Sequence, residues 1–358
     1  MTTKMRCLGK TAIFVLIVAC FLQLFASCGS RREQGKPVEL SFFAMDTYMV
    51  LKVYKGEKSA EEAKSALAAA RDGILEIEGV LSVTAEGSEV AALNRGERVE
   101  NASLHTVKLL REAKELCART DGLYDITVYP LVLAWGFTAE EGPSVPSASE
   151  IETALSEIDI ARVSVTEEAD GSFTVDAGGA KIDLGSIAKG YAGRIASDIL
   201  KEKGFDSAIL VLGGNVQTLG RKPDGSGFVV GIADPNAPER PLTTVSTSAL
   251  DSLFGEQDGE VRSYAVVTSG TYQRNFTENG KLYHHIMDVR TGYPAESGLR
   301  SVTVICPDGA LADGLSTSLF LLGYEGAMEY YRTYGGFEAV FVTDEGEILK
   351  TDGLAEMK

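Results

Sequence analysis

The segment KIDLGSIAKGYA, residues 181–192, places an acid, a small turn and a lysine within seven residues. Asp183 ends a strand-like apolar run, Gly185-Ser186 makes a turn, and Lys189 falls in the first turn of the predicted helix. Helix N-termini bind anions, whereas a lysine there opposes the helix dipole. A cation placed against that preference indicates a bound anion, with a solvated lysine as the alternative, and the acid beside it indicates a ribose, a ring N–H or a metal ion. A P-loop is excluded, because G-x-x-x-x-G-K-[ST] is absent.

The segment ADGLSTSLFLLG, residues 312–323, offers oxygen ligands for a cation. Leucines at four-residue spacing form one apolar stripe, which leaves Asp313 and Thr317 together on another face. A carboxylate and a hydroxyl one turn apart suit a hard cation such as Mg²⁺, although the same pair is also common on solvated helix faces. We interpret Gly314 between them as a point where a ligand approaches the helix closely.

The segment YHHIMDVRTGYP, residues 283–294, holds two of the three histidines of the chain. Neighbouring side chains on a strand point to opposite faces, so one of His284 and His285 faces a site while the other does not. Histidine is the usual general base near neutral pH. Zinc is disfavoured, because no cluster of further His or Cys ligands accompanies the pair.

These segments require a scaffold of strands and helices in irregular order. Residues 38–54 are predicted as two strands broken around Met45-Asp46-Thr47, and residues 67–81 have helical spacing. Further strands are predicted at 161–166, 172–177, 207–212, 228–233, 263–268, 300–305 and 337–343, and further helices at 103–119, 150–157, 187–202 and 310–333. Without strict βαβ alternation, this order predicts an α+β fold with a mixed or antiparallel sheet and flanking helices.

The N-terminus carries an export signal. Basic residues, an apolar run from Thr11 to Phe25 and the sequence Ala26-Ser27-Cys28 are typical of a secretory signal rather than a membrane span. Small residues before a cysteine resemble a bacterial lipobox, so we expect residues 1–28 to be a lipoprotein signal peptide with Cys28 lipidated. Ordinary signal cleavage nearby is the alternative. Residues 29–37 form a flexible tether to a domain at 38–358, exported and anchored to the bacterial cell membrane, facing the periplasm or the cell exterior.

The chain is acidic, with a formal net charge of −17. This charge argues against nucleic acid as a ligand, and an anionic ligand would need local help from a lysine, a helix terminus or a divalent cation. Beyond Cys28 only Cys117 and Cys306 remain, each in an apolar context. We expect both to be buried free thiols, with a single bridge between them as the alternative.

The motifs in their order resemble a known family. AMDT, SEVAALN, DGLYDITVYPLVLAWGF, IDLGSIAKGYA, LVLGGN, VVTSG, HHIMDVRTGYP and ADGLSTSLFLLG are similar to the ApbE family of FAD:protein FMN transferases from about residue 39 to 345. The resemblance implies one ApbE-like domain, either undivided or with two subdomains around an FAD cleft. It also implies an enzyme that uses Mg²⁺ to split FAD, transfers the FMN half to a threonine hydroxyl of a target flavoprotein and releases AMP. The expected partners are FAD, flavoproteins of membrane electron-transfer systems and the lipid bilayer.

The resemblance also implies roles for individual residues. The backbone carbonyl of Ser186 with Asp313 and Thr317 matches the metal site, and His285 matches the general base, which makes His285 and Asp313 the catalytic pair. Positions that match the FAD site are Met45, Thr84, Leu123, Tyr124, Asp125, Asp183, Lys189 and Ile286.

Three positions depart from the family pattern. Asp46 stands where the family has the glycine of MGT, Thr271 replaces the acid of TSGDY, and Thr84 replaces an aromatic residue able to stack on the flavin. A less enclosed flavin admits water, so Mg²⁺-dependent hydrolysis of FAD to FMN and AMP is one alternative. A non-catalytic flavin-binding lipoprotein is another, disfavoured by the retention of Asp313, Thr317 and His285. A solute-binding lipoprotein for a transporter has little support from the order of elements.

Overall fold

The structure, a computed structural model, describes residues 36–139, 141–255 and 261–356. The predicted signal peptide, the lipidation site Cys28 and residues 29–35 of the tether lie outside these ranges, so they stay predictions. No helix in the described part of the chain is both long enough and apolar enough to cross a membrane.

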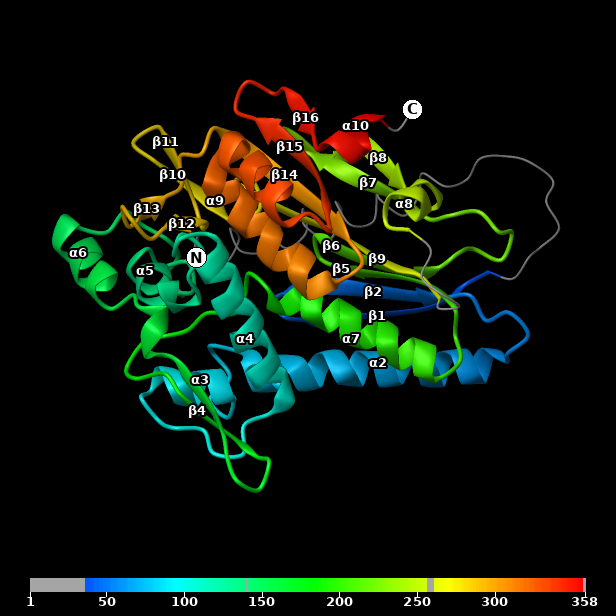
Figure 1. Cartoon of the computed structure of the whole chain (residues 1–358), viewed down its shortest axis with the longest axis horizontal. Helices are drawn as coiled ribbons and strands as arrows, with labels where there is room; N and C mark the ends of the chain where they lie inside the picture. Colours follow the sequence, from blue (N-terminus) through cyan, green and yellow to red (C-terminus); the bar gives the residue numbers. More distant parts are fainter. Residues whose placement is uncertain (1–35, 140, 256–260, 357–358) are drawn as a thin grey trace, which may run out of the picture.

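An antiparallel sheet of eight strands forms the centre of the molecule (Figure 1). Its order is β1-β2-β5-β6-β9-β14-β15-β16, and every neighbouring pair is antiparallel. The α+β fold predicted from the sequence is therefore confirmed. The strands are β1 (Val38–Ala44), β2 (Thr47–Val53), β5 (Ser207–Leu212), β6 (Asn215–Gly220), β9 (Ser263–Gly270), β14 (Leu299–Cys306), β15 (Glu338–Thr343) and β16 (Ile348–Lys350).

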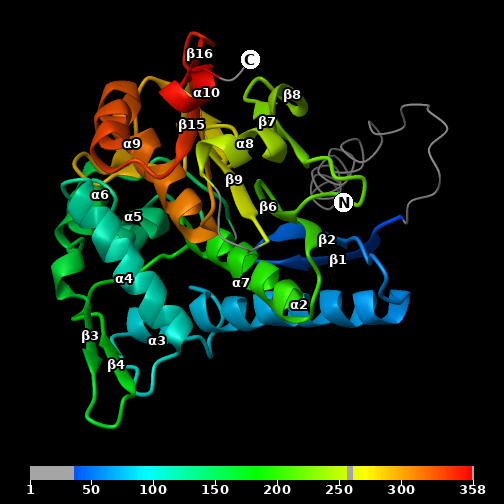
Figure 2. The same ribbon diagram turned by 45° about the vertical axis from the view of Figure 1, so that its right-hand side comes forward.

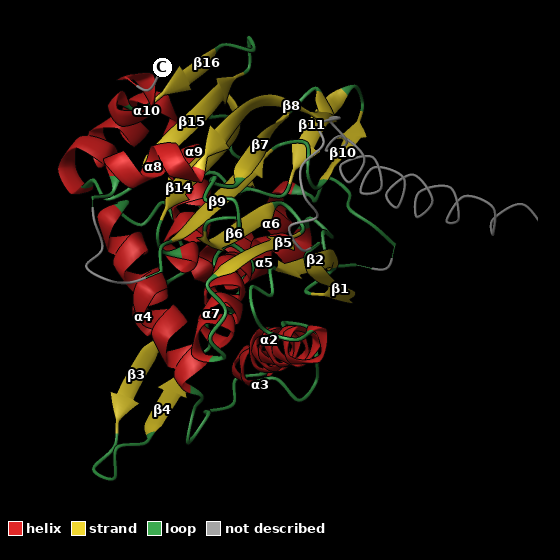
Figure 3. Ribbon diagram, turned by 90° about the vertical axis from the view of Figure 1, so that its right-hand side faces the viewer, coloured by secondary structure: helices red, strands yellow, loops and turns green. Residues whose placement is uncertain are grey.

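Different layers cover the two faces of the sheet (Figure 3). Along β9, Ala265 and Val267 pack in the core that contains the long helices, whereas Tyr264 and Val266 pack in a second core beneath a β-ribbon. This alternation follows from the two-residue period of a strand. The long helices are α2 (Ala60–Leu81), α7 (Ala188–Glu202) and α9 (Gly309–Tyr334); the ribbon layer comprises β7 (Val229–Asp234), β8 (Ala237–Ser246), α8 (Thr247–Leu253) and α10 (Asp352–Glu356).

Shorter elements lie at one end of the helical layer, those of residues 89–176 around α4 (Figure 2) and those of residues 275–294 beside α9 (Figure 1). The Trp135 indole N–H donates to the Gly292 carbonyl at 2.9 Å, which links two of these units. The elements are α3 (Glu89–Asn94), α4 (Leu104–Arg119), η1 (Ile126–Val128), α5 (Tyr129–Ala134), α6 (Ala148–Ser156), η2 (Ile160–Arg162), β3 (Ser164–Glu167), β4 (Phe173–Asp176), β10 (Asn275–Glu278), β11 (Lys281–His284), β12 (Met287–Asp288) and β13 (Tyr293–Pro294).

Helices α7 and α9 cross with their backbones in contact. A Cβ atom on Gly190 would overlap the carbonyl oxygen of Gly309, and a Cβ atom on Gly309 would overlap the carbonyl oxygen of Gly190. Glycine permits this approach because it has no side chain to separate the helices. The crossing holds the first turn of α7 against the start of α9, where Asp313 lies.

The strand predicted before α7 is wrong, because these residues do not join a sheet. Residues 181–184 run extended but pair with no other strand. Instead, the Ile182 N–H donates to Asn94 Oδ1 at 2.6 Å, and Asn94 Nδ2 donates to the Ile182 carbonyl at 2.9 Å. The Asp183 N–H donates to the Ile126 carbonyl at 2.8 Å. Ile182 and Leu184 are buried, which explains why their apolar pattern resembles that of a buried strand. The backbone of Ile182, however, pairs with the side chain of Asn94 and not with another strand.

Most other predicted elements are present. The predicted helices 187–202 and 310–333 correspond to α7 and α9, although Gly323 breaks α9 with φ 68° and ψ 175°. The predicted turn at residues 45–47 joins β1 to β2. Cys117 and Cys306 are both buried and free, so the expected free thiols are confirmed and the bridge between them is wrong.

The α7–α9 crossing leads to a test with a matched control. Replacing Gly190 by Ala inserts a methyl group between two backbones, and we expect the free energy of unfolding to fall by about 1–3 kcal/mol or more. Gly79 in α2 has nothing within 4 Å of a built Cβ atom, so Gly79→Ala is expected to raise stability by about 0.5–1 kcal/mol. Urea unfolding of both variants measures the two changes, and equal changes would contradict the crossing.

Candidate functional site

The turn before α7 is fixed by its own hydrogen bonds. Asp183 Oδ1 accepts the Gly185 N–H at 2.7 Å, and Lys189 Nζ donates to the Gly185 carbonyl at 3.1 Å. The hydroxyl of Tyr124 lies 2.9 Å from Ser186 Oγ. The predicted acid, turn and lysine therefore share one rim, and the buried side chain of Tyr124 closes it from a distant segment.

Burial and charge shift the titration of the carboxyl groups at this rim. Burial raises the pKa of Asp183, and the positive charges of Lys189 and Arg274 lower it in part. Burial also raises the pKa of Asp313, against the charge of Lys189 and a hydrogen bond from Gly190. In both cases burial is the larger cause, so each carboxylate is short of positive charge.

Asp313 and Thr317 lie in an oxygen-rich part of α9. Asp313 is 4% exposed, and its Oδ2 accepts the Gly190 N–H at 2.8 Å. Thr317 Oγ1 lies 3.1 Å from Ser269 Oγ on β9. The charge of Asp313 contributes to raising the pKa of Tyr124, after burial as the main cause. Tyr124 itself contacts Ser186 in the turn before α7.

The donor types of Asp313, Thr317 and Ser186 are those that Mg²⁺ uses in proteins. The described residues contain no group of three His, Cys, Asp or Glu side chains able to hold a metal. Structural and catalytic zinc sites require such a group. Mg²⁺ instead uses one or two carboxylates and completes its octahedron with waters and substrate phosphates. The buried carboxylate of Asp313 with the hydroxyl of Thr317 and the carbonyl of Ser186 is a set of this kind.

The interpretation of Gly314 as a ligand approach is wrong. A Cβ atom at Gly314 would overlap Leu116 Cδ1 on α4, with Ile187 next to it. Gly314 therefore serves the packing of α9 against α4.

His284 is held by both of its ring nitrogens. Nε2 lies 3.0 Å from the Ala295 carbonyl and donates to it, while Nδ1 accepts the Ile286 N–H at 3.3 Å. The ring is buried, and its edge packs against Phe320. With both nitrogens in use, His284 has a structural role.

His285 keeps one ring nitrogen free for chemistry. Its Nδ1 lies 3.3 Å from the Arg274 carbonyl, which can only accept, so Nδ1 carries the proton and Nε2 carries a lone pair. Burial lowers the pKa of His285 to about 3, and the charges of Arg274 and Lys189 contribute. Of the two predicted histidines, His285 is thus the one that faces the site.

Met45 and Asp46 form the turn between β1 and β2. Both have left-handed backbones, with φ 50° and 57°. The Met45 N–H donates to Glu78 Oε1 at 2.6 Å, and the Asp46 carboxylate lies 3.5 Å from the Arg274 guanidinium. The turn is thereby joined to the segment that holds His285.

Of the other four residues predicted to bind FAD, three are buried or partly buried and one is exposed. Asp125 caps η1, accepting the Thr127 N–H at 2.7 Å, and burial raises its pKa. Leu123 and Ile286 are buried apolar residues. Thr84 is exposed and bonds only within its own turn, with its Oγ1 3.2 Å from Ser82 Oγ.

Three residues of the site were not predicted. They are Asn215, whose side chain helps to lower the pKa of Asp313, together with Ser269 and Arg274. Asn215 and Ser269 lie in the motifs LGGN and VVTSG. These motifs stand out in the sequence but predict no role for the two residues. Arg274 lies in the turn that follows VVTSG, within residues 266–276, and no role was predicted for it.

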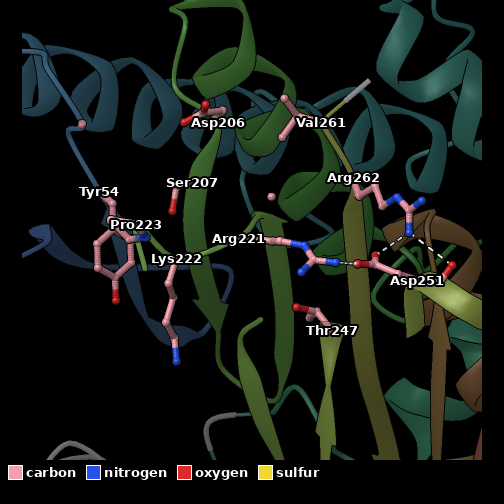
Figure 4. A pocket seen from close by; sticks show the side chains of 12 residues that line it. Tyr54, Asp206, Ser207, Arg221, Lys222, Pro223, Thr247, Asp251, Val261 and Arg262 are labelled. Carbon is pink, nitrogen blue, oxygen red and sulfur yellow. Dashed lines mark hydrogen bonds and ion pairs between the residues drawn. The ribbon is translucent and has the colours of Figure 1, made fainter. Parts of the chain in front are cut away.

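A separate pocket of about 520 Å³ lies at the opposite end of β5 and β6 (Figure 4). Ser207 opens β5 there, whereas the other end of that strand leads to Gly213 beside Thr47. Asp251 binds both Arg221 and Arg262, which neutralises much of the positive charge in the pocket. None of the predicted site residues lines it.

Known proteins resemble the chain over most of its length. The FAD:protein FMN transferase of Klebsiella pneumoniae is 32% identical over 88% of this chain and 88% of its own. That of Treponema pallidum is 29% identical over 95% and 93%. The ApbE protein of Thermotoga maritima has a TM-score of 0.76 at 31% identity, covering 89% of this chain and 98% of its own. The flavinyl transferase ApbE of Pseudomonas stutzeri has a TM-score of 0.74 at 28% identity, covering 90% and 96%.

The family model described as the ApbE family matches residues 45–341, a range that includes every residue of the site described above. With the sequence relatives and the shared fold, this match establishes that the chain belongs to the ApbE family.

Proposed function

We propose that this enzyme transfers the FMN half of FAD to a threonine hydroxyl of a target flavoprotein with the help of Mg²⁺ and releases AMP. The family and the names of its relatives support the transferase class. The observation that carries the chemistry is the ring of His285, whose Nδ1 is held by the Arg274 carbonyl and whose Nε2 has no hydrogen-bond partner among the described residues.

His285 acts as the general base. Its Nδ1 proton is held by the Arg274 carbonyl, so the ring presents Nε2 in the form that accepts a proton. The threonine oxygen attacks the phosphorus of the FMN phosphate, and the bond from that phosphorus to the bridging oxygen breaks. The bridging oxygen leaves with AMP, and the threonine proton passes to Nε2. A correctly placed base of this kind contributes about 10²- to 10⁴-fold to the rate.

Lys189 binds the pyrophosphate. Its ammonium donates only to the neutral Gly185 carbonyl, and among the described residues no carboxylate lies within ion-pair distance of it. The charge is thus available to an anion that arrives at the turn. The Asp183 carboxylate on the same rim suits the polar groups of the nucleotide.

Asp313, Thr317 and Ser186 would hold the metal. Mg²⁺ would supply neutralisation of the charge that develops on the pyrophosphate. Asp313 is held for this role by the Gly190 N–H, which fixes one of its carboxylate oxygens.

The acceptor is expected at the membrane. The lipobox-like sequence before Cys28 supports an exported protein anchored to the bacterial membrane by lipid. A tethered enzyme shares the bilayer surface with electron-transfer flavoproteins, which makes these the proposed targets.

Hydrolysis of FAD is the second candidate function. The observation in its favour is Thr84, which is exposed and places no aromatic ring where relatives are expected to cover the flavin. Water then competes with the protein hydroxyl for the same phosphorus. A protein that only binds flavin is the third candidate.

Replacing Asp313 by Asn tests the transferase and its metal site. We expect FMN transfer with Mg²⁺ to fall by about 10²-fold or more, because the metal loses its carboxylate. The matched control is Asp308→Asn at the start of the same helix, which keeps the cap on the Ala310 and Leu311 N–H groups and is expected to keep most activity.

The measurement is mass spectrometry of an acceptor domain after incubation with FAD, together with AMP release, with and without a chelator. AMP without a labelled acceptor would make the enzyme a pyrophosphatase. Neither product in any condition would leave a flavin-binding protein.

The pKa of His285 leads to a pH prediction. Because that pKa is lowered to about 3, the base stays neutral and able to accept a proton from about pH 5 to about pH 8. The value of kcat/KM should therefore show no inflection near the ordinary histidine pKa. His285→Gln should lower the rate across the whole range by about 10²-fold or more. An inflection between about pH 6 and 7 that disappears in His285→Gln would contradict the lowered pKa of His285, whereas an unchanged rate in His285→Gln would contradict its role as the base.

A further inference from the structure

The ion pair between Asp46 and Arg274 joins two segments that both belong to the site. The carboxylate of Asp46 and the guanidinium of Arg274 lie 3.5 Å apart, and their side chains are 82% and 52% exposed. Exposed pairs contribute little to stability, typically about 0.2–1 kcal/mol. The pair is therefore weak enough to be exchanged for a better partner.

Asp46 is presented by a rigid turn. The backbone at Asp46 is left-handed, with φ 57°, a conformation that aspartate and asparagine tolerate better than most residues. The turn is tied to α2 through the bond from the Met45 N–H to Glu78. The family glycine expected at this position would bring no carboxylate, so the partner of Arg274 is a feature of this sequence.

Arg274 acts on the site in two ways. Its backbone carbonyl accepts the N–H of His285 at 3.2 Å and lies 3.3 Å from Nδ1 of the same residue. Its positive charge acts to lower the pKa of both His285 and Asp183. The charge of Lys189 also acts to lower the pKa of the same two groups, so both cations act on His285 and Asp183.

We propose that Arg274 changes partners when FAD binds: the guanidinium is held by Asp46 in the free protein and moves to the pyrophosphate in the complex. This inference rests on the proposed function. Guanidinium groups bind phosphate oxygens with paired, charge-assisted hydrogen bonds, which are stronger than an exposed carboxylate contact. Lys189 and Arg274 would then hold the pyrophosphate together, and Asp46 would weaken FAD affinity by competing for Arg274.

The test is FAD affinity of the full chain, measured by flavin fluorescence with Mg²⁺ and without an acceptor. Asp46→Asn retains the left-handed turn and frees Arg274, so FAD should bind about two- to fivefold more tightly. Arg274→Gln should weaken binding about tenfold while leaving the backbone carbonyl on His285. In the Arg274→Gln background, Asp46→Asn should have no further effect. Arg274→Lys should recover part of the lost affinity, because it restores the charge but not the paired geometry.

Glu39→Gln is the matched control, because Glu39 is an exposed acid on the same hairpin with its own partner, Lys52. This variant should leave FAD affinity unchanged. Weaker or unchanged FAD binding in Asp46→Asn would overturn the partner exchange. So would an equal gain in affinity when Asp46→Asn is added to Arg274→Gln. FAD binding by the wild-type chain is the separate check on the proposed function. Its absence would overturn both, whereas normal binding with unresponsive variants would overturn the exchange alone.

Discussion

The contact between the backbones of Gly190 and Gly309 is the constraint on which the site depends. It brings the first turn of α7 so close to α9 that the Gly190 N–H reaches the carboxylate of Asp313. That N–H belongs to the start of the helix, where donors usually remain free for a ligand. Here the protein's own carboxylate takes this donor, and the proposed anion site therefore relies on Lys189 beside it.

The site gathers charged groups whose burial is not fully compensated. Burial raises the pKa of Asp183 and Asp313 and lowers that of His285, so burial outweighs the stabilisation of each charged form in the free protein. A metal ion and a pyrophosphate arriving together would supply both signs of charge. This complementarity explains how an acidic chain, with a net charge of −17, can accept an anionic substrate.

The sequence predicts the elements well where one period dominates. Helix α7 and strand β5 follow directly from their apolar spacing, and the motifs point to Asp183, Lys189, Asp313 and the pair His284-His285 before any geometry is known. The geometry itself was not predictable. Nothing in HHIM tells which histidine keeps a free nitrogen, since the Ala295 and Arg274 carbonyls decide it. Gly314 could not be separated from Gly190, because the partner of each glycine lies on another helix.

The site draws on segments spread over nearly the whole domain, from Met45 to Thr317. Its strands close through pairings such as β2 with β5 and β6 with β9, which join residues far apart in sequence. Contacts of this kind form slowly and late in folding. A chain whose sheet has not yet closed therefore has no complete nucleotide site. Only completely folded molecules would bind the ligand.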